Sequence, residues 1–121
     1  MEMPAADPAI LARRDRIVAR LRDALPGGQV IADPVAARAY ECDALTAYRC
    51  PPLAVVLPAT TDEVAAALRV CHDEGVPVIP RGAGTGLAGG VLPTADSVVV
   101  SVARMTRMLA MDTANRFVHV E

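Results

Sequence analysis

The sequence predicts a small α/β domain in which helices flank a mixed or parallel sheet. The chain has 121 residues, enough for one domain or part of one, and 53% of them are hydrophobic. The only aromatic residues are Phe117, Tyr40 and Tyr48, so the core has to be built from Val, Leu, Ala, Ile and Met. That mixture is typical of parallel sheets covered by helices. Two short apolar runs also flank a helical pattern between residues 53 and 80, which is the order of a βαβ unit.

A first amphipathic helix is expected over residues 8–25. Apolar side chains recur there at helical spacing, and the Pro26-Gly27-Gly28 sequence is a signal for the end of a helix. Acidic residues are interleaved with the basic ones of this helix, which favours a solvated helix face over a phosphate-binding track. The basic residues are Arg13, Arg14, Arg16, Arg20 and Arg22, and the acidic ones are Asp15 and Asp23.

The next segment carries weaker signals. A short strand is expected at residues 29–33 and a short helix at residues 34–40, which begins with a proline. Residues 41–52 lack a clear period, and the two prolines at their end exclude a helix there. We therefore divide the chain into an N-terminal helical segment with its connection, residues 1–50, and the main sheet-forming part, residues 51–121.

The periodicity sharpens in the second part. Residues 53–58 and 76–80 are short apolar runs of the buried-strand type, and residues 60–75 form a helical pattern between them. Strand, crossover helix and strand predict two parallel strands joined by a right-handed crossover. The helix carries a capping box at its start and a glycine stop at its end: Thr60 with Glu63, and Gly75.

Three further strands are expected near the end of the chain, at residues 97–102, 107–111 and 116–121. No turn signal, charged tail or cap follows the last of them, so the chain is expected to stop inside a strand, as a truncated domain does. An unfinished sheet presents unpaired backbone groups. This leaves open an interaction protein that uses an exposed sheet edge.

The connection between residues 80 and 97 contains five of the eight glycines of the chain. It leaves from the C-terminal end of a predicted strand, where open α/β sheets usually bind ligands. Glycine lets a ligand approach the peptide N–H groups directly, and several converging N–H groups form an anion-binding concavity. Arg81 adds a positive charge and Thr85 a hydroxyl donor. The sequence therefore predicts a site for a pyrophosphate or another compact anion, the alternative being a glycine-rich turn without a ligand.

The pattern Gly84-x-Gly86-x-x-Gly89 matches the dinucleotide fingerprint, but its context does not. The fingerprint requires a helix that opens at the last glycines and points its N-terminus at the pyrophosphate. Pro93 comes too early for such a helix, and a strand follows. We therefore exclude a nicotinamide-binding Rossmann site. The loop has to bind its anion through backbone N–H groups without a helix end.

Charge and composition exclude several other classes. The net charge is −2 and the pI about 5.6, without the clustered cations and stacking aromatics that nucleic acid binding needs. No stretch reaches the roughly 18 apolar residues of a membrane span, and no signal peptide is visible. Cys42, Cys50 and Cys71 are odd in number and lack metal-binding spacing, so we expect free thiols in a reducing cytoplasm and no metal site.

Two stretches carry a family resemblance, YECDALTAYRCPPLAVVLPATTDEV at residues 40–64 and VPVIPRGAGTGLAGGVLP at residues 76–93. With them, the sequence resembles the FAD-linked oxidases of the vanillyl-alcohol oxidase and p-cresol methylhydroxylase superfamily. It is most similar to the N-terminal part of glycolate oxidase FAD-binding subunits, in the branch that includes D-lactate dehydrogenases.

The resemblance implies the first subdomain of a two-subdomain FAD-binding domain, with the flavin between the subdomains. It places the pyrophosphate of FAD on Pro80, Arg81, Gly82, Ala83, Gly84, Thr85, Gly86, Gly89 and Gly90. Pro58 matches a further position near the cofactor. Relatives that attach flavin covalently often carry histidine where Thr85 stands, so we expect FAD to bind non-covalently.

For the intact protein, the resemblance implies oxidation of a 2-hydroxy acid, of the glycolate or D-lactate type, to the 2-oxo acid. Electrons then pass to an acceptor, often through partner oxidase subunits. This chain is expected to supply cofactor anchorage and no catalytic residue, with His72 on a helix surface and His119 in a strand. The expected location is the cytoplasm, with membrane association only through partner subunits. The alternative is a non-catalytic anion- or nucleotide-binding module, or an inactive fragment.

Overall fold

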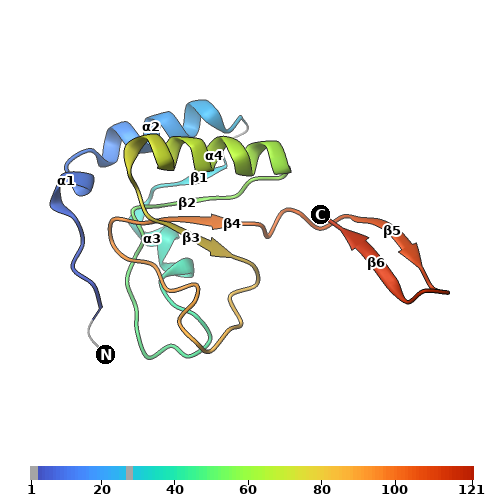
Figure 1. Ribbon diagram of the computed structural model, residues 1–121. Helices are drawn as coiled ribbons and strands as arrows, with labels where there is room; N and C mark the ends of the chain where they lie inside the picture. The colour runs from blue at the N-terminus through green and yellow to red at the C-terminus, as the bar shows by residue number, and fades with distance from the viewer. Residues whose placement is uncertain (1–2, 27–28) are drawn as a thin grey trace.

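The computed structural model describes residues 3–26 and 29–121. A four-stranded sheet forms the body of the molecule, and a separate two-stranded hairpin projects from it (Figure 1). The order in the larger sheet is β1-β2-β4-β3; its strands are β1 (Val30–Ile31), β2 (Ala54–Val56), β3 (Val78–Arg81) and β4 (Val98–Ser101). β1 pairs with β2 antiparallel, whereas β2 and β3 both pair with β4 in parallel. The predicted α/β class with a small mixed sheet is confirmed.

Helices cover both faces of this sheet. α2 (Arg14–Ala24) and α4 (Thr61–Glu74) lie side by side on one face, and α3 (Pro34–Ala37), continued by the 3₁₀ turn η1 (Arg38–Tyr40), lies on the other (Figure 1). None of the helices in the described residues has the length and apolar character needed to cross a membrane.

The helix expected over residues 8–25 is divided into α1 (Pro8–Leu11) and α2. The division falls at Arg13, whose N–H donates to the Ile10 carbonyl three residues back instead of four. The side chain of Arg13 leaves this turn toward Glu74 on α4. α2 ends at Ala24, and the expected glycine stop at residues 27–28 lies outside the described residues.

Strands β2 and β4 are buried on both sides because successive side chains of a strand point to opposite faces. In β2, Ala54 and Val56 pack toward α2 and α4, while Val55 packs toward α3. β4 repeats this arrangement, with Val99 beside Val55 on the α3 side. A strand covered on both faces reads as a continuous apolar run, which is why both segments look alike in the sequence.

The caps predicted for α4 are present. The Thr60 hydroxyl accepts the N–H of Glu63 at 3.2 Å, and the Glu63 carboxylate accepts the N–H of Ala59 at 2.7 Å. At the other end, Gly75 adopts the left-handed conformation with φ 63°. The bond to Thr60 satisfies an N–H group that the first helical turn leaves without a partner, and the glycine cap fixes the point at which the chain turns toward β3.

β2, α4 and β3 form the expected parallel strand–helix–strand unit, but its two strands are not neighbours. β4 lies between them and pairs with both, Val56 and Pro80 standing level with Val100. The chain therefore returns from β3 to the parallel β4 through the glycine-rich connection, which contains no helix.

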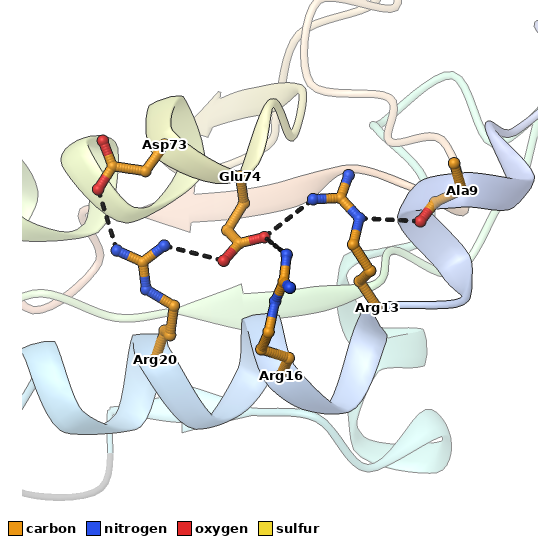
Figure 2. A network of polar contacts seen from close by, with 6 residues as sticks. All are labelled: Ala9, Arg13, Arg16, Arg20, Asp73 and Glu74. Atoms are coloured by element: carbon orange, nitrogen blue, oxygen red, sulfur yellow. Dashed lines mark hydrogen bonds and ion pairs between the residues drawn. The ribbon is translucent and has the colours of Figure 1, made fainter.

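The arginines at and after the start of α2 do not form the purely solvated face that was expected. Arg13, Arg16 and Arg20 converge on the carboxylate of Glu74 at 2.9, 2.6 and 2.8 Å (Figure 2). Arg20 also reaches Asp73 at 2.9 Å. The Glu74 side chain is buried between the two helices, so this network joins α2 to α4.

The strands expected after the glycine-rich connection are confirmed. β4 belongs to the main sheet, and β5 (Met108–Asp112) pairs antiparallel with β6 (Phe117–Val120) in a second sheet. Figure 1 shows this hairpin extending away from the helices and the main sheet. Nearly all of its residues are exposed.

Candidate functional site

The glycine-rich connection, residues 82–97, starts at the C-terminal end of β3 and consists of bends and turns. It opens no helix, which confirms that the fingerprint-like glycine pattern is not used in the Rossmann manner. Pro80 and Arg81 belong to β3, Gly82 to Gly86 begin the loop, and Gly89 and Gly90 lie at its middle.

The loop carries a run of backbone N–H groups at residues 82–88. Within the described part of the chain, none of them donates to a protein acceptor. Gly84 is half-buried, and the other six residues are exposed. A run of N–H groups without internal partners is able to receive an anion in the manner of a backbone nest. The predicted loop residues are thus brought together by one continuous turn of backbone.

Gly84 is required by the geometry of this turn. Its φ of 74° lies in the left-handed region, and a Cβ built on it comes within 2.2 Å of the Arg81 Nη2 atom. Any side chain at this position therefore has to displace the guanidinium. At Gly86, by contrast, a Cβ meets no atom within 4 Å.

Two contacts with residues outside the loop fix the position of the Arg81 guanidinium. Its Nη1 atom donates to the carbonyl oxygen of Cys42 at 2.8 Å, and its guanidinium carbon lies 5.6 Å from the ring centroid of Tyr40. The second contact is a cation–π interaction. The guanidinium is therefore fixed over Gly84, at the entrance of the loop, as a positive charge that does not have to be ordered when an anion binds.

Asp43 is the site residue that the sequence analysis missed. Its carboxylate accepts the N–H of Gly89 at 2.9 Å and the N–H of Leu45 at 3.0 Å, and the residue is only 5% exposed. The bond to Leu45, two residues ahead, is the usual one for aspartate in a turn. The bond to Gly89 joins residues 46 positions apart, and no local pattern signals it.

The two remaining predicted positions differ in their surroundings. Thr85 is exposed in the loop. Pro58 is fully buried just beyond β2. Like Arg81, it lies at the C-terminal ends of the parallel strands, but β4 separates β2 from β3. The structure therefore groups Thr85 with the glycines and places Pro58 in the supporting core.

An apolar pocket of about 380 Å³ adjoins the loop. Its lining comes from the loop, from residues 45 and 48 of the preceding connection, and from residues 3 and 4 near the N-terminus. The segment that anchors the loop thus also builds an apolar surface next to it. A second, more polar pocket of about 360 Å³ lies between the start of α4 and the β5–β6 hairpin, and none of the predicted site residues lines it.

Cys42 contributes to this arrangement through its backbone carbonyl, which accepts a hydrogen bond from Arg81 Nη1. The other two cysteines and the two histidines lie in other parts of the chain. Cys71 is buried in the core, and burial raises the pKa of its thiol to about 11. Burial also raises the pKa of Cys50, so both are thiols at neutral pH. All three cysteines are free, His72 is exposed on α4, and His119 lies in β6. The described residues contain no cluster of potential metal ligands.

Comparison with known proteins gives this geometry a family context. The chain is 42% identical over 108 residues to glycolate oxidase subunit GlcD of Escherichia coli strain K12, a match that covers 89% of this chain and 22% of the relative. It is 44% identical over 62 residues to a D-lactate dehydrogenase of Archaeoglobus fulgidus, covering 51% of this chain and 14% of the relative. The chain thus spans about a fifth of the length of the first relative and less of the second.

A crystal structure of p-cresol methylhydroxylase with bound substrate shares the fold. The TM-score is 0.70 at 17% sequence identity, with 89% of this chain and 21% of the other covered. Residues 52–121 match the family model described as an FAD binding domain, and this range contains β2, α4, β3, the glycine-rich loop and the strands that follow it. The chain therefore belongs to the FAD binding domain family.

Proposed function

We propose that this chain holds the diphosphate of FAD, without a covalent bond, on the loop formed by Pro80 to Gly86 with Gly89 and Gly90. The observation that supports this most strongly is the run of N–H groups in residues 82–88 that have no protein acceptor among the described residues. Each hydrogen bond from such a group to a charged oxygen contributes about 1.5–3 kcal/mol. The Arg81 guanidinium, held over Gly84, adds charge at the same place.

The apolar pocket beside the loop suits the part of a dinucleotide cofactor that lies outside its diphosphate. An apolar pocket beside an anion site fits a ligand with one charged and one apolar part. Thr85 offers a hydroxyl and no imidazole, which supports non-covalent binding. The residues of this chain thus bind and orient the cofactor, and none of them is assigned to proton transfer.

For the protein to which this domain contributes, we propose oxidation of a 2-hydroxy acid to a 2-oxo acid. Bound flavin supplies the two-electron chemistry of that reaction. The substrate class is suggested by the relatives, which are named as glycolate oxidase subunit and D-lactate dehydrogenase. The word subunit in the first of these names supports a partner polypeptide in the assembly.

Binding to the loop can be tested with the ¹⁵N-labelled chain. NMR titration with FAD is expected to shift the amides of residues 82–88, because their N–H groups gain acceptors. Riboflavin, which lacks the phosphates, is the matched control and is expected to leave these amides unchanged. We expect weak affinity, and no stoichiometric flavin after gel filtration, because this chain spans only about a fifth of the length of the glycolate oxidase subunit that it resembles. Loop amides that do not respond to FAD would contradict the proposal.

A pair of glycine variants sharpens the test. Gly84→Val forces a side chain into the space of the Arg81 guanidinium and into a left-handed backbone, so we expect it to abolish the FAD response. At Gly86 a Cβ meets no neighbouring atom, so Gly86→Ala is expected to keep most of the FAD response. Circular dichroism checks that both variants remain folded. Full FAD binding by folded Gly84→Val is the result that contradicts the assignment.

The alternative function, a non-catalytic anion-binding module, uses the same loop. Inorganic pyrophosphate discriminates between the two. A module that recognises only the anion binds pyrophosphate as tightly as FAD, whereas a flavin site gains affinity from the apolar pocket beside the loop.

A further inference from the structure

We infer that Asp43 is a positioning residue for the glycine-rich loop. Its carboxylate holds the loop at Gly89 and so keeps the N–H groups of residues 82–88 aligned toward the anion. The inference rests on the proposed function, because the anion it concerns is the diphosphate of FAD. It adds a residue outside the glycine motif that controls how well this motif binds.

The geometry at Asp43 is that of a fixed acceptor. One carboxylate oxygen accepts the N–H of Gly89, the other accepts the N–H of Leu45, and the side chain is almost completely withdrawn from solvent. Hydrogen bonds to a carboxylate are stronger than those between neutral groups. Gly89 has φ 77°, a conformation that a glycine adopts readily, so the backbone can turn its N–H inward at this point.

Two further bonds join the same two segments. The carbonyl oxygen of Cys42 accepts Arg81 Nη1 at 2.8 Å, and the N–H of Ala44 donates to the Gly86 carbonyl at 3.2 Å. Together with the bond from Gly89, these contacts hold the first half of the loop at Arg81, Gly86 and Gly89. Residues 42–44 therefore support the loop and hold its free N–H groups in place.

The turn that presents Asp43 carries backbone strain. Thr46 has φ 56°, and its N–H donates to the Asp43 carbonyl at 3.3 Å. A β-branched residue in the left-handed region is unfavourable and persists only where its surroundings fix it. The strain is explained if the turn has to place the Asp43 carboxylate under the loop.

The two-acceptor arrangement predicts a graded series of variants. Alanine in place of Asp43 removes both acceptor oxygens. Asparagine has nearly the same volume but only one acceptor oxygen, so it retains one of the two bonds and no charge. As a matched control, Asp112→Asn changes an aspartate that also accepts a backbone N–H in a turn, that of Asn115, in the distant hairpin.

The experiment combines amide hydrogen exchange at Gly89 with NMR titration by inorganic pyrophosphate, both on the ¹⁵N-labelled chain. We expect Gly89 to be protected in the wild type. Asp43→Ala is expected to lose this protection and to weaken pyrophosphate binding at least about tenfold. Asp43→Asn is expected to lose less of the protection and of the pyrophosphate affinity. Asp112→Asn is expected to leave both unchanged. A purely structural role would instead change amide shifts and protection throughout the main sheet, not only in residues 82–90.

Unchanged Gly89 exchange or unchanged pyrophosphate affinity in Asp43→Ala would overturn the inference and leave the proposed function standing. If Asp43→Ala does not fold, the nearly isosteric Asp43→Asn decides: wild-type affinity overturns the inference, and weakened affinity with the main sheet still protected supports it. Wild-type loop amides that ignore both pyrophosphate and FAD would overturn the proposed function, and the inference with it.

Discussion

Strands β4 and β6 have similar sequences and opposite surroundings. β4 reads VVVS and β6 reads FVHV, and both are rich in residues that favour strands. Every residue of β4 is buried, whereas every residue of β6 is exposed. The difference lies in the neighbours, because β4 pairs with strands on both sides and has helical cover, while β6 pairs with β5 alone.

This contrast shows that an apolar run determines strand conformation but not its contribution to stability. Removing apolar surface from water stabilises by about 25 cal/mol per Å², and β4 gains this on both of its faces. The hairpin gains little, since a two-stranded sheet alone is marginally stable in water. One of its faces, formed by the cross-strand pairs Met108–Val120 and Met111–Val118, is entirely apolar and still exposed. We therefore expect the free energy of folding to reside in the main sheet and its helices.

The largest expected effect comes from truncating the same residue type in each region. Leu53, beside β2, is 2% exposed, and Leu109 in β5 is 51% exposed. Leu53→Ala is expected to lower the free energy of unfolding by about 2–5 kcal/mol, because it leaves a cavity in the core. Leu109→Ala is expected to change it by less than about 0.5 kcal/mol. Urea denaturation of both variants measures the difference, and equal losses would break the comparison.

Acidification is expected to lower the stability of the fold by a smaller amount. Hydrogen bonds from Arg20 and Arg16 lower the pKa of Glu74 from its ordinary 4.5 to about 2, although burial acts in the opposite direction. Since the folded pKa lies below the unfolded one, the stabilisation is complete above about pH 4.5 and is lost as the pH falls toward 2. Thermal midpoints should therefore fall across this window.

A matched pair of variants assigns this acid effect to its region. Glu74→Gln should flatten the pH dependence, because it removes the titrating group between α2 and α4. Glu121 also has a lowered pKa, through its hydrogen bonds with Arg107 beside the hairpin. Glu121→Gln should leave the pH dependence of global unfolding unchanged, because the hairpin contributes little to it. A flattened curve in this variant would show that the hairpin folds together with the main sheet.

The last comparison concerns the free energy of opening each strand locally. We expect the amides of β6 to exchange with solvent by local opening that costs about 1 kcal/mol or less. The amides of β4 are expected to exchange only when the whole sheet unfolds. Native-state hydrogen exchange followed by NMR measures both strands in one sample. Protection of β6 equal to that of β4 would mean that the hairpin is stabilised by contacts beyond its own pairing.

The same division between local pattern and surroundings applies to the candidate site. The Arg81 charge, the glycine run and the absence of a following helix are properties of one continuous stretch, so the loop was predictable. Asp43 was not, because residues 41–52 have no periodicity and its bond to Gly89 spans 46 positions. The position of β4 between β2 and β3 was equally hidden, since strand order depends on how the faces pack.

Patterns of residue spacing by themselves predicted most of the helices and strands of this protein, the caps of α4 and the glycine-rich loop that we propose receives an anion, although the helix expected over residues 8–25 is divided in the structure. Such features follow from backbone conformation and from neighbours within a few positions along the chain. Only the tertiary structure decided which apolar strands are buried, which carboxylate the α2 arginines meet and which residues support the loop. Those outcomes depend on contacts between distant segments, whose energies exist only once the chain has brought them together.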